Sequence, residues 1–377
     1  MEISSEHIMI QDTVRKFIEK EIIPRAEMMD RESYFPDDFF PKAGELGLLG
    51  VTIPEEYGGT GLDPFSQVLI MEEIGKGSVG LGISYAAHAN LCMHNLYHHG
   101  SEYLRNKYLP DLCAGTQIGA LALTEPGAGS DALGITTTAK RDGDVYRLNG
   151  TKMFITNAPI ADVMLVYAKT DKSMGGRGLS AFIVEKEFEG YSVSRELEKM
   201  GCKCSPTGEV VFDDCIVPAE NILRKENEGL AVMMSGLDIE RLVVAANCLG
   251  CAEAAFAESV KYSKQREQFG KPICEFQLIK AKLADMYTGI EAARLMIYDL
   301  AMRTLKEPRL RKESAAAILF TAEMATKVCL EAVQIHGGYG YMLEFPVNRY
   351  LRDIKLLEIG AGTSEIRRLL IADEILR

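Results

Sequence analysis

The sequence changes its pattern twice along the chain, and the order of these patterns limits the folds that are possible. Before about residue 118 and after about residue 226, apolar residues recur at helical spacing. Between these points lie short runs rich in Val, Ile, Phe and Tyr, separated by turn signals such as Asn-Gly, at residues 144–150, 161–170, 179–186 and 208–217. No helix-length segment separates these runs, so a small antiparallel barrel or sandwich is expected rather than a parallel βαβ sheet.

Helices, then strands, then helices predict an α+β fold with three domains. We expect an N-terminal helical domain at residues 1–117, a β domain at 118–225 and a C-terminal helical domain at 226–377. The first helix is expected to begin near Ser4 and to be closed by Pro24. Further helices are expected at residues 65–76, 101–114, 228–265, 276–305, 312–336 and 364–376.

Charge and composition exclude several classes of protein. The 377 residues include 42 Lys and Arg against 54 Asp and Glu, a net charge of −12, which argues against nucleic-acid binding. No apolar run reaches the roughly 18 residues of a membrane span, so no membrane partner is expected. Nine cysteines in so long a chain are typical of a reducing compartment, and the first residues resemble neither a signal nor a transit peptide. We expect a soluble protein of a bacterial-type cytoplasm, or of the mitochondrial matrix if a transit peptide has been removed.

Two glycine-rich segments are candidates for ligand binding. In residues 121–131, Gly127 and Gly129 let backbone N–H groups approach a ligand, while Thr124 and Ser130 offer hydroxyls. A plain hairpin loop explains this segment equally well, and a nicotinamide-type site lacks its βαβ context. In residues 334–341, the glycines either cap a helix in the left-handed conformation or admit a pyrophosphate, and His336 is expected to be packed rather than a base.

One charged triplet interrupts an otherwise apolar helix. Asp238, Glu240 and Arg241 lie within one turn, which is most simply a solvated face. Their neighbours are mostly apolar, however, and a glutamate held among them would have a raised pKa suited to a general base.

The cysteines do not predict a metal site. Cys202 and Cys204 have the wrong spacing for zinc, and Cys248 and Cys251 lie inside a helical stretch. We expect no metal, and we expect these cysteines to be buried as small hydrophobic residues.

Six ordered segments together resemble the acyl-CoA dehydrogenase family over essentially the whole chain. They are IPEEYGG (53–59), ALTEPGAGSD (122–131), LNGTKMFITN (148–157), REQFGKPICEFQ (266–277), QIHGGYG (334–340) and GTSEIRR (362–368). The resemblance implies the family's fold, which has an N-terminal helical domain, a central β domain and a C-terminal four-helix-type bundle. It also implies FAD as cofactor, an acyl-CoA substrate, an electron-transferring flavoprotein as partner and a homotetramer.

The resemblance also implies which residues contact FAD. The flavin ring would be lined by Leu121, Leu123, Thr124, Gly129, Ser130, Phe154, Ile155 and Thr156. The cofactor of a neighbouring subunit would be reached by Arg266, Phe269 and Gln277. The pyrophosphate and adenosine would be held by Gln334, Gly337, Gly338, Thr363, Ser364 and Glu365. Family members often have Trp at the position of Phe154, and this chain has no Trp.

The catalytic base is the informative departure from the family pattern. Many members carry a Glu directly before the Gly-Thr of the last motif, where this chain has Ala361 followed by Gly362. The isovaleryl-CoA dehydrogenase branch instead carries its Glu in a segment similar to GLDIERL (236–242), which corresponds to Glu240. The resemblance therefore implies that Glu240 removes the α proton while the flavin accepts the β hydrogen as hydride.

The same resemblance suggests the substrate. The backbone N–H at Ala361 would bind the thioester carbonyl, and Ser130, Asp238 and Arg241 are candidates for holding the CoA or acyl portion. The small residues Gly360, Ala361 and Gly362 would leave room for a methyl branch, so a short branched acyl-CoA such as isovaleryl-CoA is favoured. NCLGCA (247–252) and Ala231 depart from that branch.

Several alternatives stay open. Benzylsuccinyl-, methylsuccinyl-, glutaryl- or longer-chain thioesters would undergo the same chemistry, and an anaerobe could run the reaction as an enoyl-CoA reduction. An acyl-CoA oxidase would usually be longer. A non-catalytic scaffold would be expected to have lost the flavin segments or every candidate base.

Overall fold

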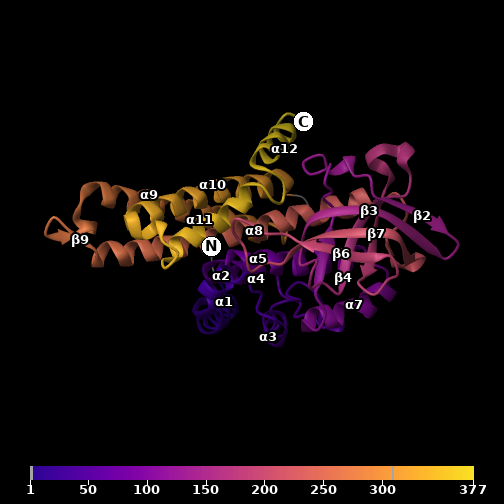
Figure 1. Cartoon of the computed structure of the whole chain (residues 1–377), viewed down its shortest axis with the longest axis horizontal. Coiled ribbons are helices and arrows are strands. Elements are labelled where there is room, and N and C mark those ends of the chain that lie inside the picture. Colours follow the sequence, from indigo (N-terminus) through magenta and orange to yellow (C-terminus); the bar gives the residue numbers. More distant parts are fainter. Residues whose placement is uncertain (1–2, 308–309) are drawn as a thin grey trace.

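A computed structural model describes residues 3–307 and 310–377. Both ends of the chain are helical, and the middle of the chain forms a sheet, which lies on the right of Figure 1. The α+β class is confirmed. The N-terminal elements are α1 (Ser5–Phe17), η1 (Ile18–Ile22), η2 (Ile23–Arg25), α2 (Ala26–Arg31), α3 (Phe39–Glu45), η3 (Glu55–Tyr57), α4 (Pro64–Gly77), α5 (Val79–Ala86), η4 (Ala87–Met93), α6 (His94–His99) and α7 (Glu102–Ala114).

Polar side chains cap the start of α1, α4, α5 and α7. The side chain of Ser4 accepts from the backbone N–H of His7 at the start of α1, and Asp63 accepts from Ser66 at the start of α4. The predicted end at Pro24 is wrong in detail. Helix α1 ends at Phe17, and the chain passes through a π turn and a 3-10 turn that contains Pro24 before α2 begins. Because proline fits the first positions of a turn, it does not stop the chain from coiling further.

The central sheet has eight strands in the order β6-β7-β3-β2-β4-β5-β8, with β1 paired to β4. Of the expected antiparallel barrel or sandwich, a closed barrel is not seen: the sheet is open, and β1 lies parallel to β4. The strands are β1 (Gly119–Ala122), β2 (Thr138–Asp142), β3 (Val145–Thr156), β4 (Val163–Lys169), β5 (Leu179–Glu185), β6 (Tyr191–Glu196), β7 (Thr207–Pro218) and β8 (Ile222–Leu223). A parallel pair such as β1 and β4 needs a long connection, and the chain from Ala122 to Val163 supplies it.

Strand β4 separates two apolar cores. Val163, Leu165 and Tyr167 pack with helix residues such as Val232 of α8, whereas Met164 and Val166 pack inside the sheet. Alternate residues of a strand point to opposite faces, so this buried strand connects the sheet core to the helices. Tyr167 therefore faces the start of α8 (Gly229–Gln265).

Most of the C-terminal elements form the elongated helical lobe on the left of Figure 1, whereas α12 projects at the top beside the C-terminus. Helix α8 and the later helix α10 run in the same direction, since Cys251 and Cys329 approach within 3.9 Å midway and Tyr262 stacks on His336 at the far end. The elements after α8 are β9 (Glu267–Gln268), β10 (Lys271–Pro272), η8 (Ile273–Glu275), α9 (Gln277–Arg303), α10 (Arg311–His336), η9 (Gly337–Tyr341), α11 (Pro346–Ile354), η10 (Lys355–Glu358) and α12 (Ser364–Ile375).

Close backbone contacts join α8 to the N-terminal helices. A Cβ added at Gly250 would lie 2.0 Å from the carbonyl oxygen of Glu72 on α4, so only glycine fits there. Asn247 donates to the carbonyl of Val79 at 3.1 Å and crowds Gly75 and Gly82. The segment NCLGCA (247–252), which the sequence singled out, therefore contains residues that pack α8 against α4 and α5. None of the helices built from the described residues is long and apolar enough to cross a bilayer.

Candidate active site

The carboxylate of Glu240 lies in the apolar interior near the start of α8. Its side chain is 7% exposed, and Oε2 has no hydrogen-bond partner. Burial raises the pKa of Glu240 to about 7, against the opposing charges of Arg241 and Arg367. A carboxylate without fixed donors and with a pKa near neutrality can take up a proton at physiological pH. The structure therefore gives Glu240 the environment of a general base.

Two buried arginines flank this carboxylate. Arg241 is 5% exposed and donates at 3.1 Å to Asp238, which is half-buried, so the predicted triplet is not a solvated face. Arg367 of α12 is 1% exposed and donates to the carbonyl oxygen of Gly360 at 2.6 Å. Sequence reasoning missed Arg367, because its position in the last helix did not indicate burial.

The loop before α12 has an unusual backbone. Ala361 has φ 55° and Gly362 has φ 88°, both in the left-handed region that side chains disfavour. Thr363 caps α12 by accepting from the backbone N–H of Ile366, and the buried hydroxyl of Ser364 has no partner. Glu365 is exposed. Since strain of this kind concentrates at functional sites, the loop is a candidate for holding a ligand.

The two segments predicted to line a flavin lie side by side. The backbone N–H of Met153 donates to the carbonyl of Thr124 at 2.8 Å, which joins residues 121–130 to residues 154–156. Phe154 is 67% exposed with φ 62° at an irregularity between β3 and β7, whereas Ile155 is buried. Other predicted positions here are half-buried or exposed and thus accessible to a ligand: Leu121, Leu123, Thr124, Thr156, Gly129 and Ser130.

A buried ion pair fixes these segments and was not predicted from the sequence. Glu125 accepts from Lys152 at 2.9 Å and from both the N–H and the hydroxyl of Thr136 and Thr137. Lys152 also donates to the carbonyl of Leu123 at 3.1 Å. Burial acts to raise the pKa of Glu125, but the Lys152 charge and these hydrogen bonds lower it to about 2. The pair holds the Gly-rich segment in place.

A second group of predicted residues lies at the opposite end of α8. Arg266 ends this helix and lies 5.7 Å from the ring of Tyr339, and Phe269 is 93% exposed. His336 is buried, stacks on Tyr262 at 4.2 Å and bonds the carbonyl of Ala332, so it is packed as expected. Gln277, Gln334, Gly337 and Gly338 are exposed at the same end. Gly337 has φ 60° and ψ −136°, so the cap is not the left-handed helical one.

The predicted cofactor residues of one chain are therefore divided between two distant places. Glu240 lies on α8 and Arg266 directly follows this helix, 26 residues further along, which corresponds to about 39 Å at the rise of an α-helix. Residues 363–365 lie at the Glu240 end, whereas residues 334–338 lie at the Arg266 end. A single chain does not bring these sets together.

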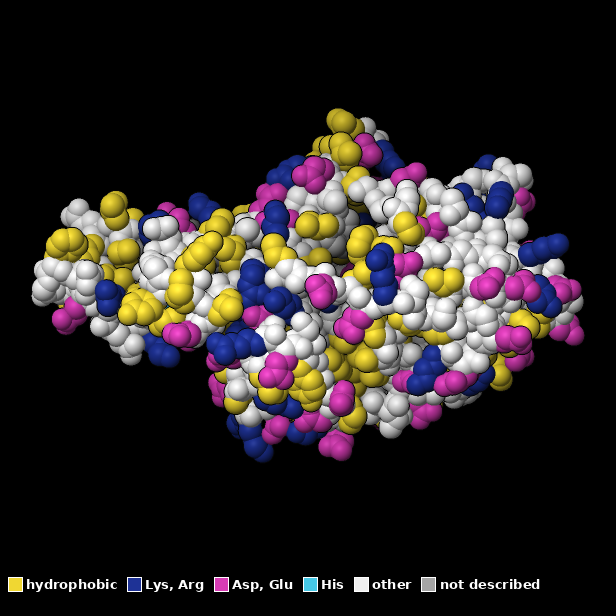
Figure 2. Space-filling model, viewed as in Figure 1, with side chains coloured by type: hydrophobic (Ala, Val, Ile, Leu, Met, Phe, Trp, Pro, Cys, Tyr) yellow, Lys and Arg dark blue, Asp and Glu magenta, His cyan; other side chains and the backbone are white. Residues whose placement is uncertain are grey.

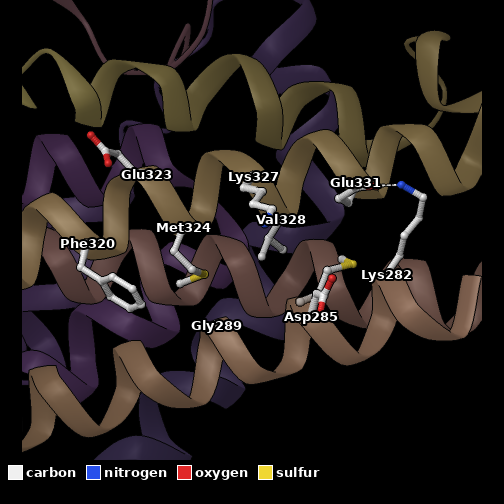
Figure 3. A pocket seen from close by; sticks show the side chains of 10 residues that line it. Lys282, Asp285, Gly289, Phe320, Glu323, Met324, Lys327, Val328 and Glu331 are labelled. Carbon is white, nitrogen blue, oxygen red and sulfur yellow. Dashed lines mark hydrogen bonds and ion pairs between the residues drawn. The ribbon is translucent and has the colours of Figure 1, made fainter. Parts of the chain in front are cut away.

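Two further surface features lie on the C-terminal lobe. Figure 2 shows hydrophobic side chains gathered over this lobe. Between α9 and α10, a pocket has Phe320, Met324 and Gly289 in its apolar lining and the Lys282–Glu331 ion pair at one end (Figure 3). Its remaining lining residues are Asp285, Met286, Glu323, Lys327 and Val328.

The cysteines are free thiols, and the four singled out in the sequence are buried, as expected. Within residues 3–307 and 310–377, no cluster of three or more His, Cys, Asp or Glu side chains is arranged to hold a metal ion.

Comparison with known proteins identifies the class that this fold represents. Family models described as acyl-CoA dehydrogenase N-terminal, middle and C-terminal domains match residues 4–116, 120–215 and 227–376. The chain belongs to the acyl-CoA dehydrogenase family and is an enzyme of that flavoprotein class.

Individual relatives cover nearly the whole chain. The mitochondrial isovaleryl-CoA dehydrogenase of Pongo abelii is 47% identical over 98% of this chain and 88% of its own length. The structure of butyryl-CoA dehydrogenase from Megasphaera elsdenii is 40% identical, with a TM-score of 0.98 and full coverage of both chains. A chain in a structure described as the electron transferring flavoprotein of Acidaminococcus fermentans is 44% identical, with a TM-score of 0.98, and covers 100% of this chain and 99% of its own.

Proposed function

We propose that the protein catalyses FAD-dependent α,β-dehydrogenation of a short, branched acyl-CoA to the 2-enoyl-CoA, with Glu240 as the base. The observation that carries this proposal is the buried, unpartnered Glu240 carboxylate whose pKa is raised to about 7. No carboxylate stands at position 361, where many family members have theirs. The location of the base on α8 agrees with the branch that the sequence resembles.

The residues present suit FAD. An exposed aromatic ring with positive φ at Phe154, the adjoining Thr124 segment and the unpartnered Ser364 hydroxyl are features that a bound planar cofactor would explain. We assign the flavin ring to residues 121–130 and 154–156. When bound, FAD would accept the hydride from the β carbon.

The protein's own groups handle the proton and the carbonyl. Glu240 takes the α proton, and the backbone N–H of Ala361 donates to the thioester oxygen as enolate charge develops. Ser130, Asp238 and Arg241 would orient the CoA or acyl portion. Because burial excludes water from Glu240, the carboxylate remains free for the substrate.

The short side chains of Gly360, Ala361 and Gly362 support a branched substrate. Moving the carboxylate from the loop to α8 removes volume from one wall of the acyl pocket. We therefore propose an isovaleryl-CoA-like substrate, which agrees with the name of the 47% identical relative.

We further propose a homotetramer that passes electrons to an electron-transferring flavoprotein. The division of the predicted cofactor residues between two ends of one chain supports sharing of each site by two subunits. The pocket between α9 and α10 and the hydrophobic side chains on the surface of this lobe support burial of the lobe against other copies (Figures 2 and 3). We also propose residues 1–117, 118–225 and 226–377 as the domain boundaries.

Anaerobic bleaching of the flavin absorbance tests the proposed reaction and substrate together. The purified protein is mixed with isovaleryl-, isobutyryl-, butyryl-, octanoyl-, glutaryl- and benzylsuccinyl-CoA. Rapid bleaching by isovaleryl-CoA above the others is expected. Bleaching by a dicarboxylic or aromatic thioester would keep the reaction and overturn the substrate. A flavin-loaded protein that no thioester bleaches would overturn the dehydrogenase function.

A further inference from the structure

Arg367 is a buried cation whose hydrogen-bonding capacity is mostly unused. Its side chain is 1% exposed, and both Nε and Nη1 lack partners, while Nη2 donates to Gly360. Burying a guanidinium group costs free energy unless its charge is balanced and its donors are used. The adjacent Arg368 is exposed and pairs with Glu323. The surface ion pair of α12 is therefore made by Arg368, and Arg367 takes no part in it.

The contacts of Arg367 indicate why a buried guanidinium group is present despite this free-energy cost. Its one hydrogen bond holds the carbonyl of Gly360, which begins the left-handed loop through Ala361 and Gly362. Its charge also acts on Glu240, and the charge of Glu240 acts on Arg367 in return. Arginine remains protonated in proteins, so this charge is permanent. The side chain of Arg367 thus bonds the loop, and its positive charge opposes the rise in the pKa of Glu240.

We propose that Arg367 is a positioning residue for the dehydrogenation: its hydrogen bond holds the Gly360–Gly362 loop, and its buried charge acts on the Glu240 carboxylate. The proposal rests on the proposed function, because it takes Glu240 as base and the Ala361 N–H as carbonyl donor. Proton removal from the α carbon and polarisation of the neighbouring thioester carbonyl must occur together. A single guanidinium group that bonds the loop, and whose charge acts on the base, couples the position of the loop to the ionisation of the base.

Other charged groups around Glu240 have different partners. Arg241 on α8 also opposes the raised pKa of Glu240, but it is paired with Asp238. Tyr167 on β4 is buried and unpartnered, and its hydroxyl is kept neutral because burial and the Glu240 charge raise its pKa. Arg311 at the start of α10 acts on Asp238 and Arg241. Arg367 alone among these side chains bonds the loop.

The test measures proton exchange and not only turnover. A 3-thia-acyl-CoA has sulfur at the β position and cannot release hydride, so deuterium uptake at its α carbon from D₂O reports the base and the carbonyl donor. The holoenzyme, Arg367→Lys, Arg367→Gln and the control Arg377→Gln are compared across pH 5–9. Arg377 lies just beyond the same helix with 68% of its side chain exposed and pairs with Glu374.

Distinct outcomes are expected for each variant. Arg367→Gln should slow exchange at least tenfold and move the acidic limb of the pH profile up by roughly one unit, since an opposite charge has been removed. Arg367→Lys keeps the positive charge but loses the planar guanidinium group that bonds Gly360. It should therefore slow exchange while leaving the acidic limb of the pH profile in place. Arg377→Gln should match the parent protein.

The result separates this inference from the proposed function. If Glu240→Gln abolishes exchange but Arg367→Gln leaves the limb and rate unchanged, only the positioning role is overturned. If Glu240→Gln exchanges normally, the proposed base is overturned first. If Arg367→Gln does not fold, the exchange rate of Arg367→Lys decides. If Arg367 had only a structural role, every variant that folds would exchange at the rate of the parent protein.

Discussion

Two equally buried glutamates in this protein have opposite surroundings. Glu125 is 4% exposed and receives five hydrogen bonds, including one from Lys152, whereas Glu240 is 7% exposed and its Oε2 receives none. The pKa of Glu125 falls to about 2 and that of Glu240 rises to about 7. Burial alone therefore does not decide the role of a carboxylate. Five donors keep Glu125 ionised in a structural role, whereas Glu240 lacks such donors, as the proposed role of a base requires.

Breaking the ion pair between Glu125 and Lys152 should have the largest effect, and this effect should be on stability. Lys152→Met leaves the Glu125 carboxylate buried without its cation, which typically costs about 3–5 kcal/mol. We expect that loss in the free energy of unfolding, measured by urea denaturation at pH 7. The control Lys140→Met lies exposed on β2 and should change stability by less than about 0.5 kcal/mol. Equal effects of the two substitutions would contradict a bracing role.

Removing the unpartnered carboxylate should instead affect the rate. Glu240→Gln has the same shape but cannot take a proton, so turnover should fall at least about 10²-fold, equivalent to about 2.7 kcal/mol. Steady-state kinetics with the preferred acyl-CoA measures this loss, with flavin content as a check of folding. Glu358→Gln is the matched control, because Glu358 is paired with Lys355 and its pKa is lowered. If Glu358→Gln lost the activity instead, the base would have to be reassigned.

The two glutamates should also give stability opposite pH dependences. An unfolded glutamate has a pKa of about 4.3. Between that value and about 7, folded Glu240 keeps a proton that the unfolded chain has lost, so its contribution to stability falls as pH rises, by about 1.4 kcal/mol per unit. Between about 2 and 4.3, folded Glu125 is ionised while the unfolded chain is protonated, so its contribution is lost as pH falls.

Urea unfolding over a pH series measures both slopes. Relative to the parent, Glu240→Gln should gain stability from pH 5 to pH 7 and then level off. The deficit of Glu125→Gln should shrink as the pH is lowered from 5 towards 3. Parallel curves for the parent and either variant would remove the contrast between the two carboxylates.

The smallest expected effect concerns the acyl pocket. Ala361→Glu adds a carboxylate at the loop and fills space, so it should change the preference for straight over branched acyl-CoA by about tenfold, the low end for one added group in a pocket. Relative kcat/KM for butyryl- and isovaleryl-CoA measures this ratio. An unchanged ratio would show that the loop does not limit pocket width.

The surroundings of the two glutamates depend on tertiary contacts, and such contacts limit what could be predicted from the sequence. Long periodic segments gave α8 and α10 nearly to the residue. The parallel pairing of β1 with β4 was missed, because it joins residues far apart in the chain, and the short α11 lacked enough periods to be recognised. The assignment of Glu240 as base came from the family resemblance, with its apolar neighbours as support, and stays a prediction. Lys152 and Arg367 were not predicted, because the burial of a cation depends on tertiary contacts that local pattern does not encode.

The length of α8 has a consequence for how activity would depend on dilution. This helix of 37 residues keeps the Arg266 end of the chain about 39 Å from Glu240. If each cofactor needs both ends, then a dissociated monomer contains two incomplete halves and no complete site. Specific activity would then decline with protein concentration below the assembly's dissociation constant, and an excess of a variant damaged at one end would rescue a variant damaged at the other.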